Sequence, residues 1–454
     1  MTELRNLPDS YLLHPETVLL PTGFTDDVAI AVVGDRIGWV GSRRELPAPY
    51  EQLPRYELPR HAVLPGFVDA HQHLTQSLGS TFAYGEPSEI FRRVWLPLEQ
   101  SLTEDEMAIS VDLAALESMR GGFTGVAEAG TRSAHDVEII ADVARRRGLR
   151  TVLGLICHDV GPDAPDADEV VRRAERHLSR YANDPWITPS IAVAVPEMAT
   201  DKTLHRLARL CEEAGAVLQS HVNEHLASVE RSLLSDDRRP LERLDAVSAV
   251  GPWLLAAHAV LLTPQEMMLM RDRGASWSYN PVASAWKGNA IADALTMLAL
   301  GVRTGLGTDG TRGDGFRLME SAETAARFAS ASRVGDPFAG QGRVWLDAAT
   351  SGAADAVGLD SGGPDSTGAI REGAHADLLV LDLRVPELTP SHDLAWDLVR
   401  VGNRDQLHAV ITGGRPRIVD GRRVGSDQDE LLQRAADAAH AVATRACLRP
   451  RRQR

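Results

Sequence analysis

The chain has 454 residues, of which 43% are hydrophobic and 24% are charged, the composition of a globular protein with enough apolar side chains for a large core. The 48 Lys and Arg residues stand against 63 Asp and Glu residues, and the formal net charge of −15 argues against a nucleic-acid partner. The apolar runs are too short to cross a bilayer, and the N-terminus lacks the pattern of a signal peptide. We therefore expect a soluble, cytoplasmic protein with no membrane partner.

The N-terminal region, residues 1–61, has the pattern of short strands and turns. Val28–Val33 and Ile37–Val40 flank Gly34-Asp35-Arg36, which predicts a β-hairpin. Such a pair of strands is too small to form a stable core by itself, so we expect it to pair with strands from elsewhere in the chain.

Apolar strand candidates alternate with amphipathic helix candidates between residues 62 and 372. The predicted strands are Ala62–Val68, Thr124–Ala127, Thr151–Ile156, Ile187–Val195, Ala216–Gln219, Trp253–Ala257, Ala275–Tyr279 and Val302–Leu306. The predicted helices are Glu104–Met119, Ala134–Arg147, Asp168–Tyr181, Lys202–Ala214, Pro264–Arg273, Ile291–Leu300 and Arg317–Ala331. This alternation predicts an α/β fold with parallel strands, and eight strands is the number that closes a TIM-like (β/α)8 barrel over 62–372.

The C-terminal region returns to short strands, with candidates at Leu378–Leu381, His408–Ile411 and Arg417–Val419. We predict that residues 1–61 and 373–425 together form one small β-sandwich domain, because neither part has enough strands alone. A C-terminal helix, Glu430–Arg445, and a basic tail complete the segment 426–454.

Four of the predicted barrel strands end in side chains that bind metals. The first strand leads into His71-Gln72-His73, the fifth into His221, the sixth into His258 and the eighth into Asp309. The C-terminal ends of barrel strands meet at one rim, and strand residues two apart point to the same side. An HxH pair alone is weak evidence, but its repetition at other strand ends predicts a site for zinc or a similar divalent ion.

The residues Leu64 to His73, His221-Val222-Asn223-Glu224, Ala257-His258, Asn280-Pro281, Gly305 to Asp309 and Gly373 to Leu378 occur in that order. As a set they resemble the amidohydrolase superfamily, in the branch of amino-heteroaromatic deaminases and triazine hydrolases. The metal ligands implied by this resemblance are His71, His73, His221 and Asp309. It also implies that His258 contacts the metal-bound water and that Glu224 transfers protons.

The lysines bear on the number of metal ions. Two-metal members of the superfamily bridge their ions with a carboxylated lysine at the end of strand four. This chain has two lysines, Lys202 and Lys287, and neither lies on a predicted barrel strand. Glu197, just after the fourth strand, is left open as a substitute bridge. We expect one divalent ion per chain, zinc, with iron as the alternative.

The chemistry that such a site performs follows from the needs of hydrolysis. A bound divalent ion lowers the pKa of water from 15.7 toward roughly 7. Asp309 can then accept a proton, and His258 can hold the resulting hydroxide by a hydrogen bond. Glu224, three residues beyond His221, would protonate a ring nitrogen and later the departing amine, a kind of proton transfer worth about 10²–10⁴ in rate.

Other polar residues near the strand ends are weaker candidates for contacts with substrate. An indole at the mouth of the barrel could stack on a flat ring, and an arginine could pair with a carbonyl or an anionic substituent. These candidates are Gln76, Glu128, His158, His225, Trp286 and Arg312.

Two departures from the related deaminases concern the wall of the pocket. Those proteins commonly carry Ser-Asn after Asn-Pro, whereas this chain carries Val282-Ala283 and continues to Gly288 without that pair. After Asp309, their Asn-rich loop is replaced by residues 310–315, which contain no asparagine. The nucleoside substrates of the better-known members are therefore not carried over.

We predict a metal-dependent hydrolase that removes an exocyclic amine from a small heteroaromatic molecule, a purine, pterin, pyrimidine or triazine, and releases ammonia. Hydrolysis of a cyclic amide, or displacement of another leaving group as in a chlorohydrolase, is the alternative among enzymes. A degenerate barrel that serves as a binding module is the alternative outside enzymes. The sequence leaves a homo-oligomer open.

Overall fold

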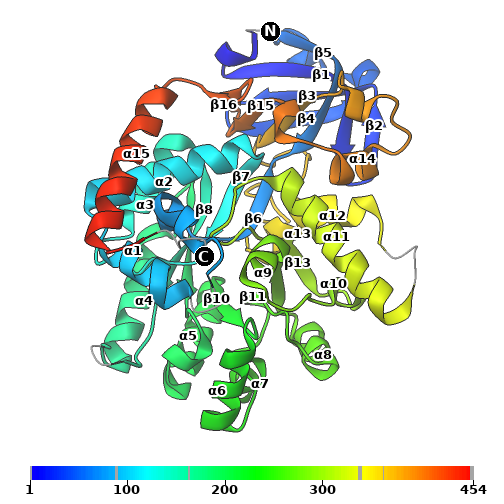
Figure 1. The fold of residues 1–454 in the computed structure, drawn as a ribbon. Helices are drawn as coiled ribbons and strands as arrows, with labels where there is room; N and C mark the ends of the chain where they lie inside the picture. The colour runs from blue at the N-terminus through cyan, green and yellow to red at the C-terminus, as the bar shows by residue number, and fades with distance from the viewer. Residues whose placement is uncertain (1–2, 87–89, 162–163, 336–339, 361, 450–454) are drawn as a thin grey trace.

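The computed structural model describes residues 3–86, 90–161, 164–335, 340–360 and 362–449, and Figure 1 shows its fold. Eight parallel strands follow one another around a sheet in chain order. They are β6 (Phe67–Gln72), β7 (Phe123–Glu128), β8 (Arg150–Ile156), β9 (Ile187–Ala192), β10 (Val217–Val222), β11 (Leu254–His258), β12 (Ser276–Tyr279) and β13 (Arg303–Leu306). A single bridge between Gln72 and Asp309 joins the first strand to the segment after the last. The predicted (β/α)8 barrel is confirmed.

Helices pack around the outside of this barrel (Figure 1). They are α1 (Leu96–Gln100), α2 (Glu104–Arg120), α3 (Glu138–Arg147), α4 (Ala167–Tyr181), α5 (Asp201–Ala214), α6 (Leu226–Asp236), α7 (Pro240–Ala246), α8 (Pro264–Arg273), α9 (Pro281–Lys287), α10 (Ala294–Ala299), α11 (Gly315–Val334), α12 (Gly342–Ala349) and α13 (Ser351–Ala356). Several begin at side-chain caps that the sequence supplies. Thr103 and Thr263 each form a capping box with the glutamate three residues later, which satisfies backbone amides of the first turn of α2 and α8.

The smaller domain is a nine-stranded sheet built from both chain ends. Its strands are β1 (Ser10–Leu20), β2 (Gly23–Asp26), β3 (Val28–Val33), β4 (Arg36–Ser42), β5 (Arg55–Pro65), β14 (Leu378–Asp382), β15 (Leu407–Thr412), β16 (Arg415–Val419) and β17 (Arg422–Arg423). β5 joins the two parts, because it pairs parallel with β1 and antiparallel with β14. One hydrophobic cluster contains residues of β1, β3, β5, β14, β15 and β16, so the sheet encloses its own core.

The strand predicted over Ala62–Val68 is wrong as a single element. Residues 55–65 form β5 in the smaller sheet, and the barrel begins only at Phe67. The break falls at Gly66, where an added Cβ would lie 2.0 Å from Oγ1 of Thr124, so the close approach of the chains requires glycine. The domain limits 1–61, 62–372, 373–425 and 426–454 stay predictions.

The C-terminal part adds α14 (Leu394–Arg400) and α15 (Gln428–Arg445). α15, red in Figure 1, lies against α2, and ion pairs join Arg434 to Asp105 and Arg445 to Glu106. Among the described residues, every helix is too short or too polar to span a membrane.

Candidate metal centre and active site

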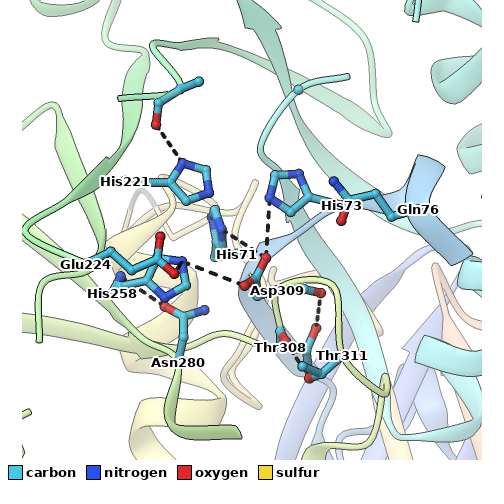
Figure 2. Close-up of polar contacts among 12 residues, drawn as sticks. His71, His73, Gln76, His221, Glu224, His258, Asn280, Thr308, Asp309 and Thr311 are labelled. Atoms are coloured by element: carbon cyan, nitrogen blue, oxygen red, sulfur yellow. Dashed lines mark hydrogen bonds and ion pairs between the residues drawn. The ribbon is translucent and has the colours of Figure 1, made fainter. Parts of the chain in front are cut away.

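The histidines predicted from the strand ends meet at the rim of the barrel (Figure 2). His71 is the last but one residue of β6, and His73 lies just beyond that strand. His221 lies on β10, His258 ends β11 and Asp309 follows β13. The ligand atoms of His71, His221, His258 and Asp309 all lie within 4.8 Å of one another. Residues separated by more than 230 positions in the sequence therefore surround one point in space.

The backbone turns sharply where these strands end. Asn223, His258 and Asp309 have φ angles of 48°, 65° and 57°, in the left-handed region that residues other than glycine rarely adopt. Such strain persists only where surrounding contacts hold it, and it gathers at functional sites. Here the amide of His258 donates to Oδ1 of Asn280 at 3.2 Å, and the amide of Asp309 donates to the carbonyl of His71 at 2.7 Å.

The imidazoles of His71, His73 and His258 are buried and that of His221 is partly buried, which favours the neutral form in which histidine binds metals. Burial lowers the pKa of His73 and of His258 to about 3, and burial also lowers the pKa of His71 and His221. Both ring nitrogens of His71 and of His258 lack a hydrogen-bond partner among the described residues. Buried polar atoms are rarely left unpaired, and a group of imidazole and carboxylate donors suits zinc. The residues present therefore fit a divalent ion.

The carboxylate of Asp309 has a different set of neighbours at each oxygen. Oδ1 lies 3.4 Å from Nε2 of His73 and 3.8 Å from Nε2 of His71. Oδ2 lies 3.8 Å from Nε2 of His258 and 2.6 Å from Nζ of Lys287. Asp309 thus separates an imidazole side of the site from a side that carries a lysine.

Glu224 lies on the same side as Lys287. Its Oε1 is 2.8 Å from Nζ of Lys287, 3.7 Å from Nε2 of His258 and 3.3 Å from Nε2 of His225. Burial raises the pKa of Glu224, but its contacts with His258, with the Lys287 ammonium and with His225 outweigh burial and hold that pKa well below its usual value. Glu224 is therefore an ionised proton acceptor.

Lys287 is the site residue that the sequence reasoning missed. It ends the short helix α9, and its side chain is only 13% exposed. The available signal was that one of just two lysines follows Asn280-Pro281 within seven residues. The other lysine, Lys202, is exposed at the start of α5.

Two contacts orient the ligand residues. Nδ1 of His221 lies 2.7 Å from the carbonyl oxygen of Ala194, which can only accept, so this nitrogen carries the proton and Nε2 is left for a metal. Asp69, fully buried on β6, accepts from the amide of His71 at 3.2 Å and from the amide of Thr308 at 2.9 Å. Asp69 therefore ties the first barrel strand to the residue before Asp309.

The site opens into a cavity of about 1200 Å³. Of the weaker candidates, Gln76, His158 and His225 line it, as does Glu197. Glu197 accepts from Ser228 at 2.6 Å and lies outside the group of metal-ligand atoms. The predicted ligand His73 is also outside this group of four, which contains His258 instead, and no further residue of the described chain joins it.

The structure does not bring three other candidates into the cavity wall. Both oxygens of Glu128 accept from backbone amides, of Leu74 at 2.5 Å and of Gly130 at 3.0 Å, so Glu128 shapes the turn after His73. Trp286 packs edge-on against Tyr84 with ring centroids 5.0 Å apart. Arg312 turns away, pairs with Asp314 at 3.2 Å and lines a separate hollow beside α11. The predicted contact of Arg312 with substrate is therefore unsupported.

Comparison with known proteins gives consistent matches along nearly the whole chain. The family model described as "Amidohydrolase family" matches residues 62–417. A 5-methylthioadenosine/S-adenosylhomocysteine deaminase of Syntrophobacter fumaroxidans is 29% identical over 420 residues, 92% of this chain and 94% of that protein. A 5'-deoxyadenosine deaminase of Methanopyrus kandleri is 26% identical over 92% of this chain and 96% of its own.

Solved structures show the same fold. The crystal structure of an adenosine deaminase from Xanthomonas campestris with bound zinc superimposes with a TM-score of 0.86 at 26% identity. The match covers 96% of this chain and 99% of that one. The architecture of barrel and small sheet is thus common to both proteins.

Proposed function

This chain belongs to the amidohydrolase family, and from that membership and the geometry of its site we propose that it is a metal-dependent hydrolytic deaminase of amino-substituted nitrogen heteroaromatics. The observation that carries the proposal is the position of ionised Glu224, 3.7 Å from His258 and beside a group of buried, unpaired imidazoles. Hydrolysis of a C–N bond needs a proton acceptor at this place.

We assign the metal to the side of Asp309 that carries Oδ1. His71 and His73 face that oxygen, and His221 has Nε2 free beside them. His258 faces Oδ2 with Lys287, so it is assigned to the substrate and proton-transfer side. One divalent ion, zinc in our proposal, supplies Lewis-acid activation of the attacking water when bound.

Side chains of this protein transfer the two protons of the attacking water. Glu224 accepts a proton as water attacks the ring carbon, and it passes that proton to the adjacent ring nitrogen. His258 holds the attacking oxygen through a hydrogen bond. Glu224 then takes the second proton from the hydroxyl now attached to the ring carbon and gives it to the exocyclic amine as the bond between carbon and that nitrogen breaks, so ammonia leaves and a carbonyl oxygen takes its place on the ring.

Ammonia release by the zinc-loaded protein tests this function. The panel contains aminated purines and their nucleosides, including adenosine and 5'-deoxyadenosine, with pterins, pyrimidines and triazines. We expect ammonia from at least one class, and none from the Glu224→Gln protein. Release of chloride or opening of a cyclic amide without ammonia would favour the other hydrolases. A fully metal-loaded protein that turns over no member would favour a binding module.

A further inference from the structure

Glu197 is the acidic residue of the cavity wall that the proposed function leaves without a role. The acidic side chains that line the cavity, among the described residues, are Asp136, Glu197, Glu224 and Asp309. Glu224 and Asp309 contact Lys287, and Asp136 pairs with Arg180 at 3.0 Å. Glu197 differs from these three, because its partner is the hydroxyl of a serine and no basic side chain of the described residues pairs with it.

The two oxygens of the Glu197 carboxylate have different surroundings. Oε1 accepts from the hydroxyl of Ser228 at 2.6 Å, and Ser228 is itself only 7% exposed. Oε2 is buried and has no hydrogen-bond partner among the described residues. Buried polar atoms are rarely left unpaired, because an unpaired one costs free energy. Oε2 is therefore an acceptor that a ligand in the cavity can satisfy.

The turn that carries Glu197 is held at both ends by one side chain. This turn is η6 (Pro196–Met198), which follows β9. The guanidinium of Arg243, on α7, donates to the carbonyl of Pro196 at 2.9 Å and to the carbonyl of Ala199 at 2.9 Å. Arg243 is 7% exposed, so water competes little for these bonds. Glu197 thus projects into the cavity from a backbone that is fixed before a ligand binds.

Glu197 is connected to the metal centre on two sides. Three residues before it, the carbonyl of Ala194 accepts from Nδ1 of His221 at 2.7 Å and from the amide of His221 at 3.1 Å. On the other side, the amide of Ser228 donates at 3.0 Å to the carbonyl of His225, the residue after the proposed proton acceptor. These short links indicate that Glu197 borders the part of the cavity where the ring binds.

We propose that Glu197 determines specificity, and that its Oε2 accepts a hydrogen bond from a second N–H group of the aminated ring, either a second amino group or a ring N–H. The inference rests on the proposed deaminase function, which supplies the aminated ring. An ionised carboxylate accepts hydrogen bonds and cannot donate them. Glu197 therefore favours a ring edge that carries N–H over one that carries a carbonyl or a bare ring nitrogen.

Calorimetry with the zinc-loaded Glu224→Gln full chain tests this contact without turnover. Each diamino ring is compared with a partner in which a methyl group of similar size replaces one amino group: 2,6-diaminopurine with 2-methyladenine, and 2,4-diaminopyrimidine with 4-amino-2-methylpyrimidine. We expect the diamino ring of at least one pair to bind about 10-fold or more tightly, the effect of one hydrogen bond to a charged group. Equal affinities within both pairs, or no binding of any ring, would overturn the proposal.

Adding Glu197→Gln to this protein assigns the preference to Glu197. Glutamine has the same size, but when its amide oxygen keeps the bond to Ser228, its NH2 group takes the place of Oε2, and two donors then face each other. We expect the preference for the diamino ring to disappear and the zinc content to stay unchanged.

Two further variants complete this comparison. Glu197→Met removes both oxygens and should also lose the preference for the diamino ring. Glu175→Met, at an exposed position of α4 outside the cavity wall, is the matched control and should keep it. A preference that survives in Glu197→Gln and Glu197→Met would overturn the proposal. Loss of zinc from these two variants would also overturn it, because Glu197 would then be a metal ligand.

A hydroxyl on a substituent is the other kind of donor that Oε2 can accept from. Adenosine and 9-methyladenine distinguish it, since the first carries ribose hydroxyls and the second carries none. We expect the ratio of their affinities to be the same with and without Glu197→Gln. A ratio that falls toward 9-methyladenine in the Glu197→Gln protein would assign Oε2 to a hydroxyl and overturn the contact with a ring N–H.

Turnover separates this inference from the proposed function. With Glu224 intact, ammonia release gives kcat/KM for both rings of each pair. We expect the wild type to prefer the diamino ring, and Glu197→Gln to lose that preference while it still releases ammonia. Ammonia release without a preference for the diamino ring would end the inference and keep the deaminase. A preference in binding that depends on Glu197, with no ammonia from any ring, would keep the contact and end the deaminase.

Discussion

The ammonium nitrogen of Lys287 lies 2.6 Å from Oδ2 of Asp309 and 2.8 Å from Oε1 of Glu224. One cation therefore joins the two carboxylates of the site. Burial lowers the pKa of Lys287, but Asp309 and Glu224 outweigh burial and raise it, so the ammonium stays charged. The lysine in turn keeps both carboxylates ionised.

Replacing Lys287 with methionine should shift the acid limb of the kcat/KM profile to higher pH. Lys287 helps to hold the pKa of Glu224 below its usual value, so its loss raises that pKa, and the ionised base is lost at a higher pH than in the wild type. The measurement is kcat/KM against pH, with Lys202→Met at the exposed lysine as control. The same profile for Lys287→Met and wild type would remove Lys287 from the chemistry.

The Lys287→Met substitution should also lower the free energy of unfolding. Removing one partner of a buried ion pair costs about 3–5 kcal/mol of unfolding free energy. We expect a loss of this order for Lys287→Met in metal-free protein and a smaller one with zinc, since the metal supplies positive charge beside Asp309. Equal losses in both states would contradict this.

Alanine variants at His73 and His258 distinguish ligand from proton-side residue. His73 and His71 face Oδ1 of Asp309, whereas His258 faces Oδ2. We expect about one zinc ion per chain in the wild type, little zinc in His73→Ala, and retained zinc with lost turnover in His258→Ala. Metal analysis after dialysis measures this. Zinc loss in His258→Ala would make His258 a ligand, as its place in the 4.8 Å group also allows.

Glu224→Gln should retain zinc and lose turnover by about 10²–10⁴. Glutamine keeps the size of the side chain but cannot accept a proton as the water attacks. Glu230→Gln, at an exposed position of α6, is the control. Turnover of the Glu224→Gln protein near the wild-type rate would remove Glu224 from the mechanism.

Most of the barrel could be predicted from the sequence, because buried parallel strands are short apolar runs and the helices between them are amphipathic. The helix over Pro264–Arg273 was predicted with its observed ends, where Thr263 caps the start and Gly274 the end. The division at Gly66 could not be predicted, because the apolar run 62–68 continues through it while the chain passes from one sheet to another.

The positions of site residues at strand ends could be predicted from the sequence. The positions of residues on a loop or a short helix could not. His71, His221 and Asp309 follow from barrel geometry. Lys287 reaches Glu224 and Asp309 from the end of the short helix α9, and the sequence has no local pattern that fixes the direction of this helix. Arg312 is three residues from Asp309, but the chain turns after Thr311, whose hydroxyl donates to the carbonyl of Thr308, and Arg312 lines a separate hollow.

Arg312→Ala should therefore leave kcat and KM unchanged. Its side chain is 36% exposed and pairs with Asp314 outside the cavity, so its loss changes no contact in the wall of the active-site cavity. Steady-state kinetics on the substrate found by the ammonia screen measures this. A changed substrate preference in Arg312→Ala would restore the sequence-based prediction of a substrate contact.

Asp69→Ala should weaken both the fold and the metal centre, although Asp69 contacts no substrate. Its carboxylate accepts from the amides of His71 and Thr308 and from the Thr308 hydroxyl. Each buried donor left unpaired costs about 1–3 kcal/mol, and these donors lie beside two metal ligands. Thr308→Val is the matched control, since it removes one donor and leaves the carboxylate.

The pH dependence of that effect has a definite sign. Burial raises the pKa of Asp69 from 3.8 to about 7, so between these values the folded chain holds a proton that the unfolded chain has lost. Stability from this group is then greatest at low pH and falls as pH rises toward 7. In metal-free protein, the unfolding free energy of wild type minus that of Asp69→Ala should therefore be larger at pH 5 than at pH 8. Denaturant melts at both pH values measure it, and a difference that grows with pH would show that Asp69 is ionised in the folded chain.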